Sequence, residues 1–163
     1  MKHELLRVLK VMNEATGHVD FSEFSNMVNL QPNETMTVLR ELAKTGHLRK
    51  VGNGYALTEK GKTALKALIP VPAGEKFEFY LEIGRPAGNS AATPIEFYEI
   101  IKEISTTSLE FHVCRKDFET WARKTLDNAA FAQALAGIEE IGLLGEELRN
   151  AITKAFESTY NLR

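Results

Sequence analysis

Several features that restrict a protein's setting are scarce in this sequence. The 163 residues contain one cysteine, Cys114, so no disulfide can form within the chain, and a reducing, cytoplasmic setting is expected. No apolar run approaches the roughly 18 residues of a membrane-spanning helix. The first 15 residues mix acidic and basic side chains at helical spacing, which favours an amphipathic helix over a signal peptide.

Neither sign of charge dominates the chain. It carries 20 Lys and Arg against 22 Asp and Glu, a net charge of −2. Residues 1–70 hold 10 basic and 7 acidic residues (+3), and residues 71–163 hold 10 and 15 (−5). The N-terminal part can therefore attract a polyanion, and the acidic C-terminal part cannot. A charge of +3 alone does not identify a nucleic-acid binder.

Proline is also scarce, and two of the five prolines fall in one short segment. Residues 69–75, IPVPAGE, combine these prolines with a glycine and interrupt a helical pattern. We therefore predict two domains, residues 1–70 and residues 75–163.

Helical spacing of apolar residues dominates the first domain. Leu5, Leu6 and Leu9 predict a first helix that ends at Gly17. Asp20 is then expected to cap a short second helix. Pro32 suits the first turn of a third helix, over about 33–45.

A hairpin is predicted directly behind the third helix. Leu48 and Val51 precede a Gly-Asn-Gly turn, and Tyr55 and Leu57 follow it. Thr58 is expected to cap a further helix. The order of elements is thus helix, short helix, helix, hairpin and helix.

Residues 3–68 resemble the winged helix-turn-helix of prokaryotic transcription regulators. This resemblance implies that the third helix enters the major groove of double-stranded DNA, that the hairpin at about 49–55 touches the DNA backbone or the minor groove, and that the protein is a homodimer. It is carried by residues spread over the third helix, the hairpin and the start of the last helix: Leu39, Leu42, Gly46, Leu48, Tyr55, Leu57, Thr58 and Gly61.

The predicted DNA-binding residues follow from this placement. Arg and Asn side chains can bind base edges in pairs of hydrogen bonds, and Thr can meet a phosphate or a thymine methyl. Glu34 counts against the prediction, because phosphates repel a carboxylate. The alternative is an ordinary solvated face, in a winged-helix module that binds protein and not DNA. The candidates are Asn33, Thr35, Thr37, Arg40, Lys44, Arg49, Lys50 and Asn53.

The second domain is predicted to be mostly helical with one strand at its start. Residues 76–83, KFEFYLEI, alternate apolar and polar side chains, as a half-buried strand does. This strand must join the hairpin, pair with an unrecognised neighbour or pair with a second chain. Residues 84–92 are expected to form a loop, and Thr93 and Ser108 to cap helices. The fold class is therefore mainly α, a winged helix-turn-helix domain followed by a helical α+β domain.

Residues 92–150 are similar to a small uncharacterised domain of archaeal and bacterial proteins, a resemblance that implies no activity. The shared pattern is Ser108, Leu109, Phe111, His112, Asp117, Phe118 and Trp121.

A catalytic or metal site is not expected in the second domain. His112, Cys114 and Asp117 lie close in sequence, but a zinc site needs four ligands and a nucleophilic cysteine needs an adjacent base. We expect His112 to form a hydrogen bond with a buried backbone group or with Asp117. We expect no cofactor. A small-molecule or protein effector is the remaining option, with a pocket among Phe97, Tyr98, Phe111, His112 and Trp121.

Overall fold

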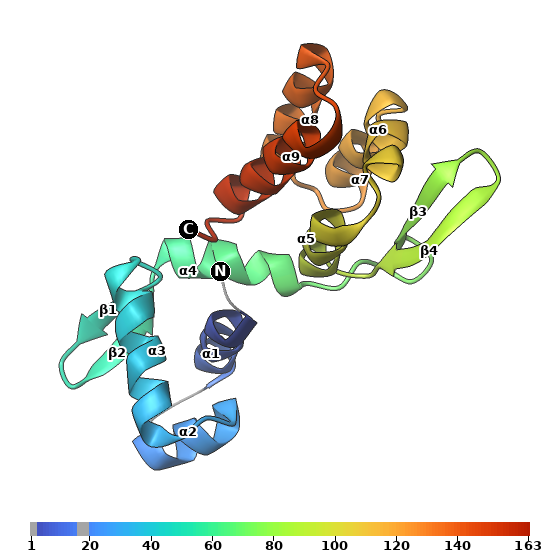
Figure 1. Ribbon diagram of the computed structural model, residues 1–163. Coiled ribbons are helices and arrows are strands. Elements are labelled where there is room, and N and C mark those ends of the chain that lie inside the picture. Colours follow the sequence, from blue (N-terminus) through green and yellow to red (C-terminus); the bar gives the residue numbers. More distant parts are fainter. Residues whose placement is uncertain (1–2, 16–19) are drawn as a thin grey trace. The chain divides into compact units, whose positions relative to one another are not determined.

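The computed structural model describes residues 3–15 and 20–163, so Gly17, predicted to end the first helix, lies outside the described residues. The described chain is mainly helical with two small antiparallel strand pairs, which confirms the mainly α class (Figure 1). It divides into two compact units, one formed by Met1–Lys66 together with Tyr160–Arg163 and the other by Ala67–Thr159.

The second unit is thus an insertion within the first. The boundary falls a few residues before the proline-rich segment, and a short 3₁₀ turn, η1 (Lys66–Leu68), spans it. Residues 160–163 were predicted to belong to the second domain, but Tyr160 and Leu162 are buried in the first unit. Tyr160 continues the four-residue spacing of Leu148, Ile152 and Phe156, so the local pattern assigns it to the second domain.

Predicted start signals hold for the helices of the first unit. The Asp20 carboxylate accepts a hydrogen bond from Glu23 N at 2.9 Å, and Pro32 is the first residue of α3. Gly46 has φ +80° after α3, a conformation that favours glycine. The elements are α1 (His3–Glu14), α2 (Phe21–Val28), α3 (Pro32–Lys44), β1 (Leu48–Val51), β2 (Gly54–Leu57) and α4 (Glu59–Leu65).

The core of the first unit is aliphatic. α1 contacts α2, α3, α4 and β2, and its buried face is Leu5, Leu6, Val8 and Leu9. α3 buries Val38, Leu39 and Leu42, whereas Met36 is only partly covered.

The second unit consists of a strand pair followed by helices. α9 packs against α5, α6 and α8, and its buried face is formed by Leu148, Ile152 and Phe156, which are spaced four apart. Its elements are β3 (Phe77–Glu82), β4 (Arg85–Ala91), α5 (Pro94–Glu103), α6 (Thr106–Cys114), α7 (Asp117–Lys124), α8 (Ala129–Ile141) and α9 (Gly145–Thr159).

The prediction of a single strand in this unit was wrong. Residues 85–91, expected to be loop, form β4 and pair antiparallel with β3. The pairing is irregular, with register shifts on both sides of Tyr80, and Ile83 lies 81% exposed beyond the strand. The sequence RPAGNSA has almost no strand propensity, so this strand is set by its partner and not by its own residues. The second of the three alternatives for residues 76–83 is therefore the one that the structure shows.

One helix start also differs from prediction. Ser105, not Ser108, caps α6, because its hydroxyl accepts from Thr107 N and Ser108 lies inside the helix. α8 passes through Gly137 and ends at Gly142, whose φ of +76° stops the helix. The cap predicted at Thr93 is present, since its hydroxyl accepts from Glu96 N at 3.2 Å.

Aromatic rings fill the core of the second unit. Phe97 lies with its ring centroid 5.0 Å from that of Phe118 and 5.2 Å from that of Trp121. Phe77 and Phe79 from β3 complete the same cluster. The predicted effector pocket is therefore wrong in its location: its residues Phe97, Tyr98, His112 and Trp121 are packed as core, and only Phe111 is partly exposed.

Candidate nucleic-acid interface

The exposed face of α3 carries four of the predicted residues. Asn33, Thr37, Arg40 and Lys44 are spaced four, three and four apart, so they share one side of the helix, and all four are exposed. The Thr37 hydroxyl donates to Asn33 O at 2.9 Å and keeps its lone pairs for an incoming donor. This face offers amide, hydroxyl and cationic groups in one row.

Thr35 is not part of this surface. Its side chain is fully buried, at 0% exposure, and its hydroxyl donates to Gln31 O at 3.0 Å. The prediction that Thr35 contacts DNA is therefore corrected, because position 35 turns toward the core. Helical spacing agrees with this burial, because Thr35 lies four residues before Leu39 and seven before Leu42, whereas the prediction rested on the chemistry of threonine.

Glu34 has a structural role at the start of α3. Its carboxylate accepts a hydrogen bond from Gln31 N at 2.9 Å, and a negative charge there is favoured by the helix dipole. The carboxylate that counted against DNA binding is thus held at the helix end.

The hairpin adds two exposed cations. Arg49 pairs with Ala56 and Lys50 with Tyr55 across the strands. Successive strand residues point to opposite faces, so Arg49 and Lys50 lie on opposite sides of the hairpin. Asn53 is exposed at the turn. A groove that receives the hairpin can meet both cations, whereas a flat surface would meet one.

Four cations of this region are without partners in the described chain. No hydrogen bond or ion pair within residues 3–15 and 20–163 engages the side chains of Arg40, Lys44, Arg49 or Lys50. Two other lysines of the first unit are engaged. Lys62 lies 2.7 Å from Glu59, and Lys60 donates to Thr45 O at 2.8 Å. These four unpaired cations lie on α3 and β1, which contact each other.

His47 joins the elements behind this surface. It is fully buried between α3 and β1, and its backbone N–H donates to Leu42 O at 2.9 Å. Its carbonyl accepts from both the amide and the hydroxyl of Thr58, at 3.1 and 3.0 Å. The end of α3, the start of β1 and the cap of α4 therefore meet at one residue.

Gly61 makes this junction possible. A Cβ at position 61 would lie 2.3 Å from His47 O, far inside contact distance. Only glycine lets α4 approach the backbone of His47 this closely.

The ring of His47 reaches the segment that follows α9. Its Nε2 lies 2.6 Å from Asn161 O, and its Nδ1 lies 2.7 Å from the Thr45 hydroxyl. A carbonyl can only accept, so Nε2 carries the proton and Nδ1 of the neutral ring accepts from Thr45. Burial lowers the pKa of His47 below 6.5, although the hydrogen bond to the Asn161 carbonyl acts in the opposite direction. The lowered pKa keeps the ring neutral at pH 7.

In the second unit, two side chains of α6 hold one residue of β3. The Ser108 hydroxyl donates to Tyr80 O at 2.7 Å, and Tyr80 N donates to His112 Nε2 at 2.8 Å. Ser108 and His112 are four apart and thus lie on the same face of the helix. They satisfy both backbone groups of Tyr80, at the point where the β3–β4 register shifts.

Asp117 and Trp121 complete this clamp. His112 Nδ1 donates to the Asp117 carboxylate at 2.8 Å, and Trp121 Nε1 donates to Glu75 O at 2.9 Å. Burial lowers the pKa of His112, and Asp117 opposes that shift. Both expected roles of His112 are present, because it satisfies a buried backbone group and reaches Asp117.

In the clamp, the Ser108 hydroxyl and His112 Nε2 are each hydrogen-bonded to the backbone of Tyr80. Cys114 is exposed and free, and the described residues include no group of three or more possible ligands of a metal. The polar residues of the sequence pattern instead fasten the strand to the helices.

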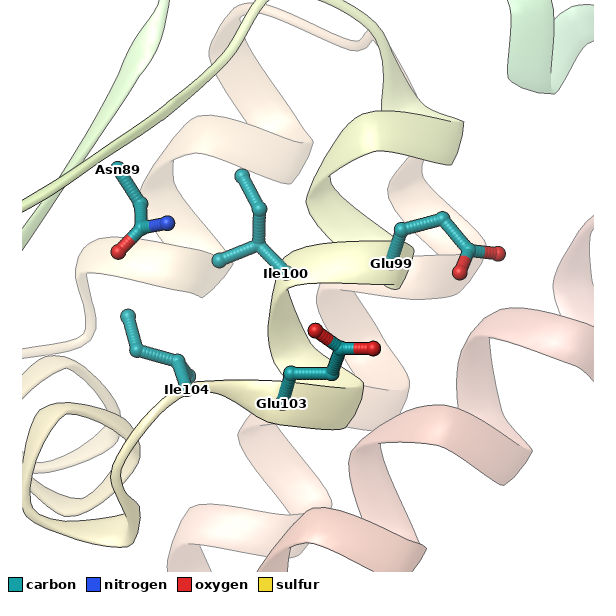
Figure 2. Close-up of a pocket in the computed structure, with 5 residues that line it drawn as sticks. All are labelled: Asn89, Glu99, Ile100, Glu103 and Ile104. Carbon is teal, nitrogen blue, oxygen red and sulfur yellow. The ribbon is translucent and has the colours of Figure 1, made fainter.

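A groove lies between β4 and α5 (Figure 2). Ile100 and Ile104 form its apolar part, Asn89 stands on the β4 side, and Glu99 and Glu103 stand at its rim. Glu99 is paired with Lys102 at 2.7 Å, so one carboxylate of the rim is already engaged.

Comparison with known proteins gives one match. The sequence profile of DUF5752, a family of unknown function, matches residues 57–157. The chain belongs to this family. The DUF5752 match covers α4 and nearly all of the second unit, including the Ser108–His112 clamp, and leaves α1, α2 and α3 outside. No curated protein and no solved structure matches the chain. Among the described residues, no helix is long and apolar enough to span a bilayer.

Proposed function

We propose that the first unit binds double-stranded DNA as a winged helix-turn-helix and that the protein regulates transcription. In this proposal α3 enters the major groove, with Asn33, Thr37, Arg40 and Lys44 toward the bases and phosphates. The β1–β2 hairpin brings Arg49, Lys50 and Asn53 to the backbone or the minor groove. No cofactor or catalytic step is required.

The observation that carries the proposal is the distribution of unpaired charge. Arg40, Lys44, Arg49 and Lys50 are exposed and unpaired within the described residues, on two elements that touch each other. Four such cations on adjoining elements attract phosphates, and each phosphate that they neutralise releases a counterion.

The partners follow from the same geometry. A single helix reads a few base pairs, so a homodimer on two half-sites would supply the affinity and the specificity of a regulator. The acidic second unit repels DNA and is free to bind an effector or a protein. We place the protein in the cytoplasm, where its one cysteine stays reduced.

The test measures duplex binding as a function of salt. Fluorescence anisotropy of a labelled mixed-sequence duplex is followed for the wild type and for the double variant Arg40→Ala with Lys44→Ala. Each lost phosphate contact reduces the magnitude of the slope of log affinity against log salt by about 0.9. The slope of the double variant should therefore be smaller in magnitude by up to about 1.8.

A matched control removes the same charge elsewhere. Lys10→Ala with Lys62→Ala deletes two lysines whose nearest carboxylates are Glu14 at 4.0 Å and Glu59 at 2.7 Å. This control should keep the wild-type slope. An unchanged slope in the α3 variant, or equal losses in both variants, would contradict the placement of the interface.

The second candidate is a winged-helix module that binds protein. Phe21 and Met27 of α2 are 39% and 48% exposed, which provides apolar surface of the kind used in protein contacts. If the folded wild type binds no duplex even at low salt, this candidate replaces the first.

A further inference from the structure

The segment after α9 completes the first unit. Tyr160 and Leu162 are each only 3% exposed, and the Asn161 carbonyl between them accepts from His47 Nε2. Asn161 has φ +53°, a left-handed conformation that asparagine tolerates better than most residues. Two apolar side chains and one buried hydrogen bond thus hold the segment in place.

The residue that receives this segment also fixes the proposed DNA-binding surface. His47 lies two positions before Arg49, and its backbone is bonded to α3 through Leu42 and to the α4 cap through Thr58. Asn161 holds this junction through the side chain of His47. His47 therefore links the segment after α9 to the first residue of β1.

We propose that residues 160–162 are a latch, and that His47 is a positioning residue that uses it to hold the β1–β2 hairpin against α3. With the latch docked, Arg49 and Lys50 keep a fixed distance from Arg40 and Lys44. With the latch released, the hairpin moves and the two pairs of cations no longer match the spacing of phosphates. The effect on DNA rests on the proposed function, and the effect on the hairpin does not.

The latch also provides a route of control. Residues 160–162 follow α9 directly, and α9 packs against α5, α6 and α8 in the second unit. A ligand that shifts the end of α9 would change the docking of the latch, and the hairpin would respond. An effector of the second unit can thus act on DNA binding without touching the first unit.

Three variants separate the hydrogen bond from the packing. His47→Leu keeps an apolar side chain and removes both ring hydrogen bonds, whereas His47→Gln keeps an N–H donor for Asn161 O. A chain ending at Thr159 removes the latch itself. Ser158→Ala is the control, because Ser158 is exposed at the end of α9 beside the latch.

Two measurements are made on each variant. Hydrogen exchange of amides 48–57 reports the hairpin without any DNA, and the salt slope of duplex binding reports the phosphate contacts. A lost buried hydrogen bond is worth up to about a tenfold change in opening, so His47→Leu should exchange up to about tenfold faster in the hairpin. Its salt slope should fall by up to about 1.8, as if Arg49 and Lys50 had lost their phosphates.

The slope distinguishes positioning from a loss of stability. Partial unfolding lowers the amount of active protein and leaves the slope of the remainder unchanged. His47→Gln and Ser158→Ala should stay near the wild type in both measurements, and the shortened chain should match His47→Leu or exceed it. Wild-type protection of amides 48–57 in His47→Leu and in the shortened chain would overturn the latch.

Failure of the proposed function would look different. A folded wild type that binds no duplex, with faster hairpin exchange in His47→Leu, would overturn DNA binding and support the latch. An unchanged salt slope in His47→Leu, with a wild type that binds DNA, would overturn the role of His47 in positioning the cations. If the shortened chain does not fold, the latch is tested by hairpin exchange in His47→Leu compared with His47→Gln, and equal exchange in the two would overturn it.

Discussion

Tyr80 and His112 are joined by a hydrogen bond from a backbone amide to a ring nitrogen. Tyr80 N donates to His112 Nε2 at 2.8 Å, which requires the ring to be unprotonated at that nitrogen. Ser108, one turn earlier on α6, donates its hydroxyl proton to Tyr80 O, the other backbone group of the same residue. The irregular strand β3 is thus held by a helix at the residue where its register with β4 shifts.

Replacing His112 should destabilise the second unit. His112→Ala leaves a buried amide of Tyr80 without an acceptor and opens space among the aromatic rings, so the free energy of unfolding should fall by about 2–4 kcal/mol. Urea denaturation followed by tryptophan fluorescence measures the loss. Cys114→Ala, an exposed change two residues later, is the control and should stay within about 0.5 kcal/mol of the wild type.

Acid should weaken the fold through His112. Burial lowers its pKa from 6.5 in the folded state, so the unfolded state binds protons more readily. The stabilising contribution is full above pH 6.5 and declines as the pH falls below that value toward the folded pKa. Urea midpoints between about pH 7.5 and about pH 5 should decrease for the wild type.

The same titration on His112→Gln isolates this contribution. Glutamine has no titratable group, so its decrease over that range should be smaller than that of the wild type. His47, whose pKa burial also lowers, remains in both proteins and accounts for a residual decrease. An equal decrease of the urea midpoint with falling pH in the two proteins would show that the pKa of His112 does not change on folding.

Replacement of glycine by alanine should have opposite effects on stability at positions 61 and 137. Gly61→Ala forces a Cβ to within 2.3 Å of His47 O and should destabilise the first unit by about 1–3 kcal/mol. Gly137 lies inside α8, and a Cβ there would meet nothing within 4 Å among the described residues, so Gly137→Ala should stabilise by about 0.5–1 kcal/mol. Thermal unfolding of the two variants checks both signs.

The correction at Thr35 can be checked against its neighbour on α3. Thr35→Val removes a buried hydroxyl that bonds Gln31 O, so stability should drop by about 1 kcal/mol while duplex affinity stays within about twofold. Thr37→Val changes an exposed hydroxyl on the proposed interface and should lower affinity with little effect on stability. The reverse pattern in anisotropy and urea unfolding would place Thr35 at the DNA.

Local signals in the sequence predicted the helices well. Asp20, Thr58 and Thr93 cap helices where expected, because a cap depends only on a side chain and the backbone three residues later. The hairpin at 48–57 was equally visible through its Gly-Asn-Gly turn.

Long-range pairing was not visible. β4 has a loop-like sequence and is a strand because β3 lies beside it, and Asn161 meets His47 across 114 positions of the chain. In the candidate site, the exposed row on α3 and the burial of Thr35 both agree with helical periodicity, but the role of His47 depends on contacts that no local pattern contains. The DUF5752 match likewise starts at residue 57 and gives no information about α3.

The inserted arrangement of the two units has a consequence for synthesis. Chains fold from the N-terminus as they leave the ribosome, yet the first unit here lacks Tyr160 and Leu162 until the whole second unit has been made. The first 66 residues must therefore wait with an incomplete core while residues 67–159 fold. A fragment cut at the proline-rich boundary would carry that same incomplete core permanently, so the proposed DNA-binding surface belongs to the whole chain and not to residues 1–70 alone.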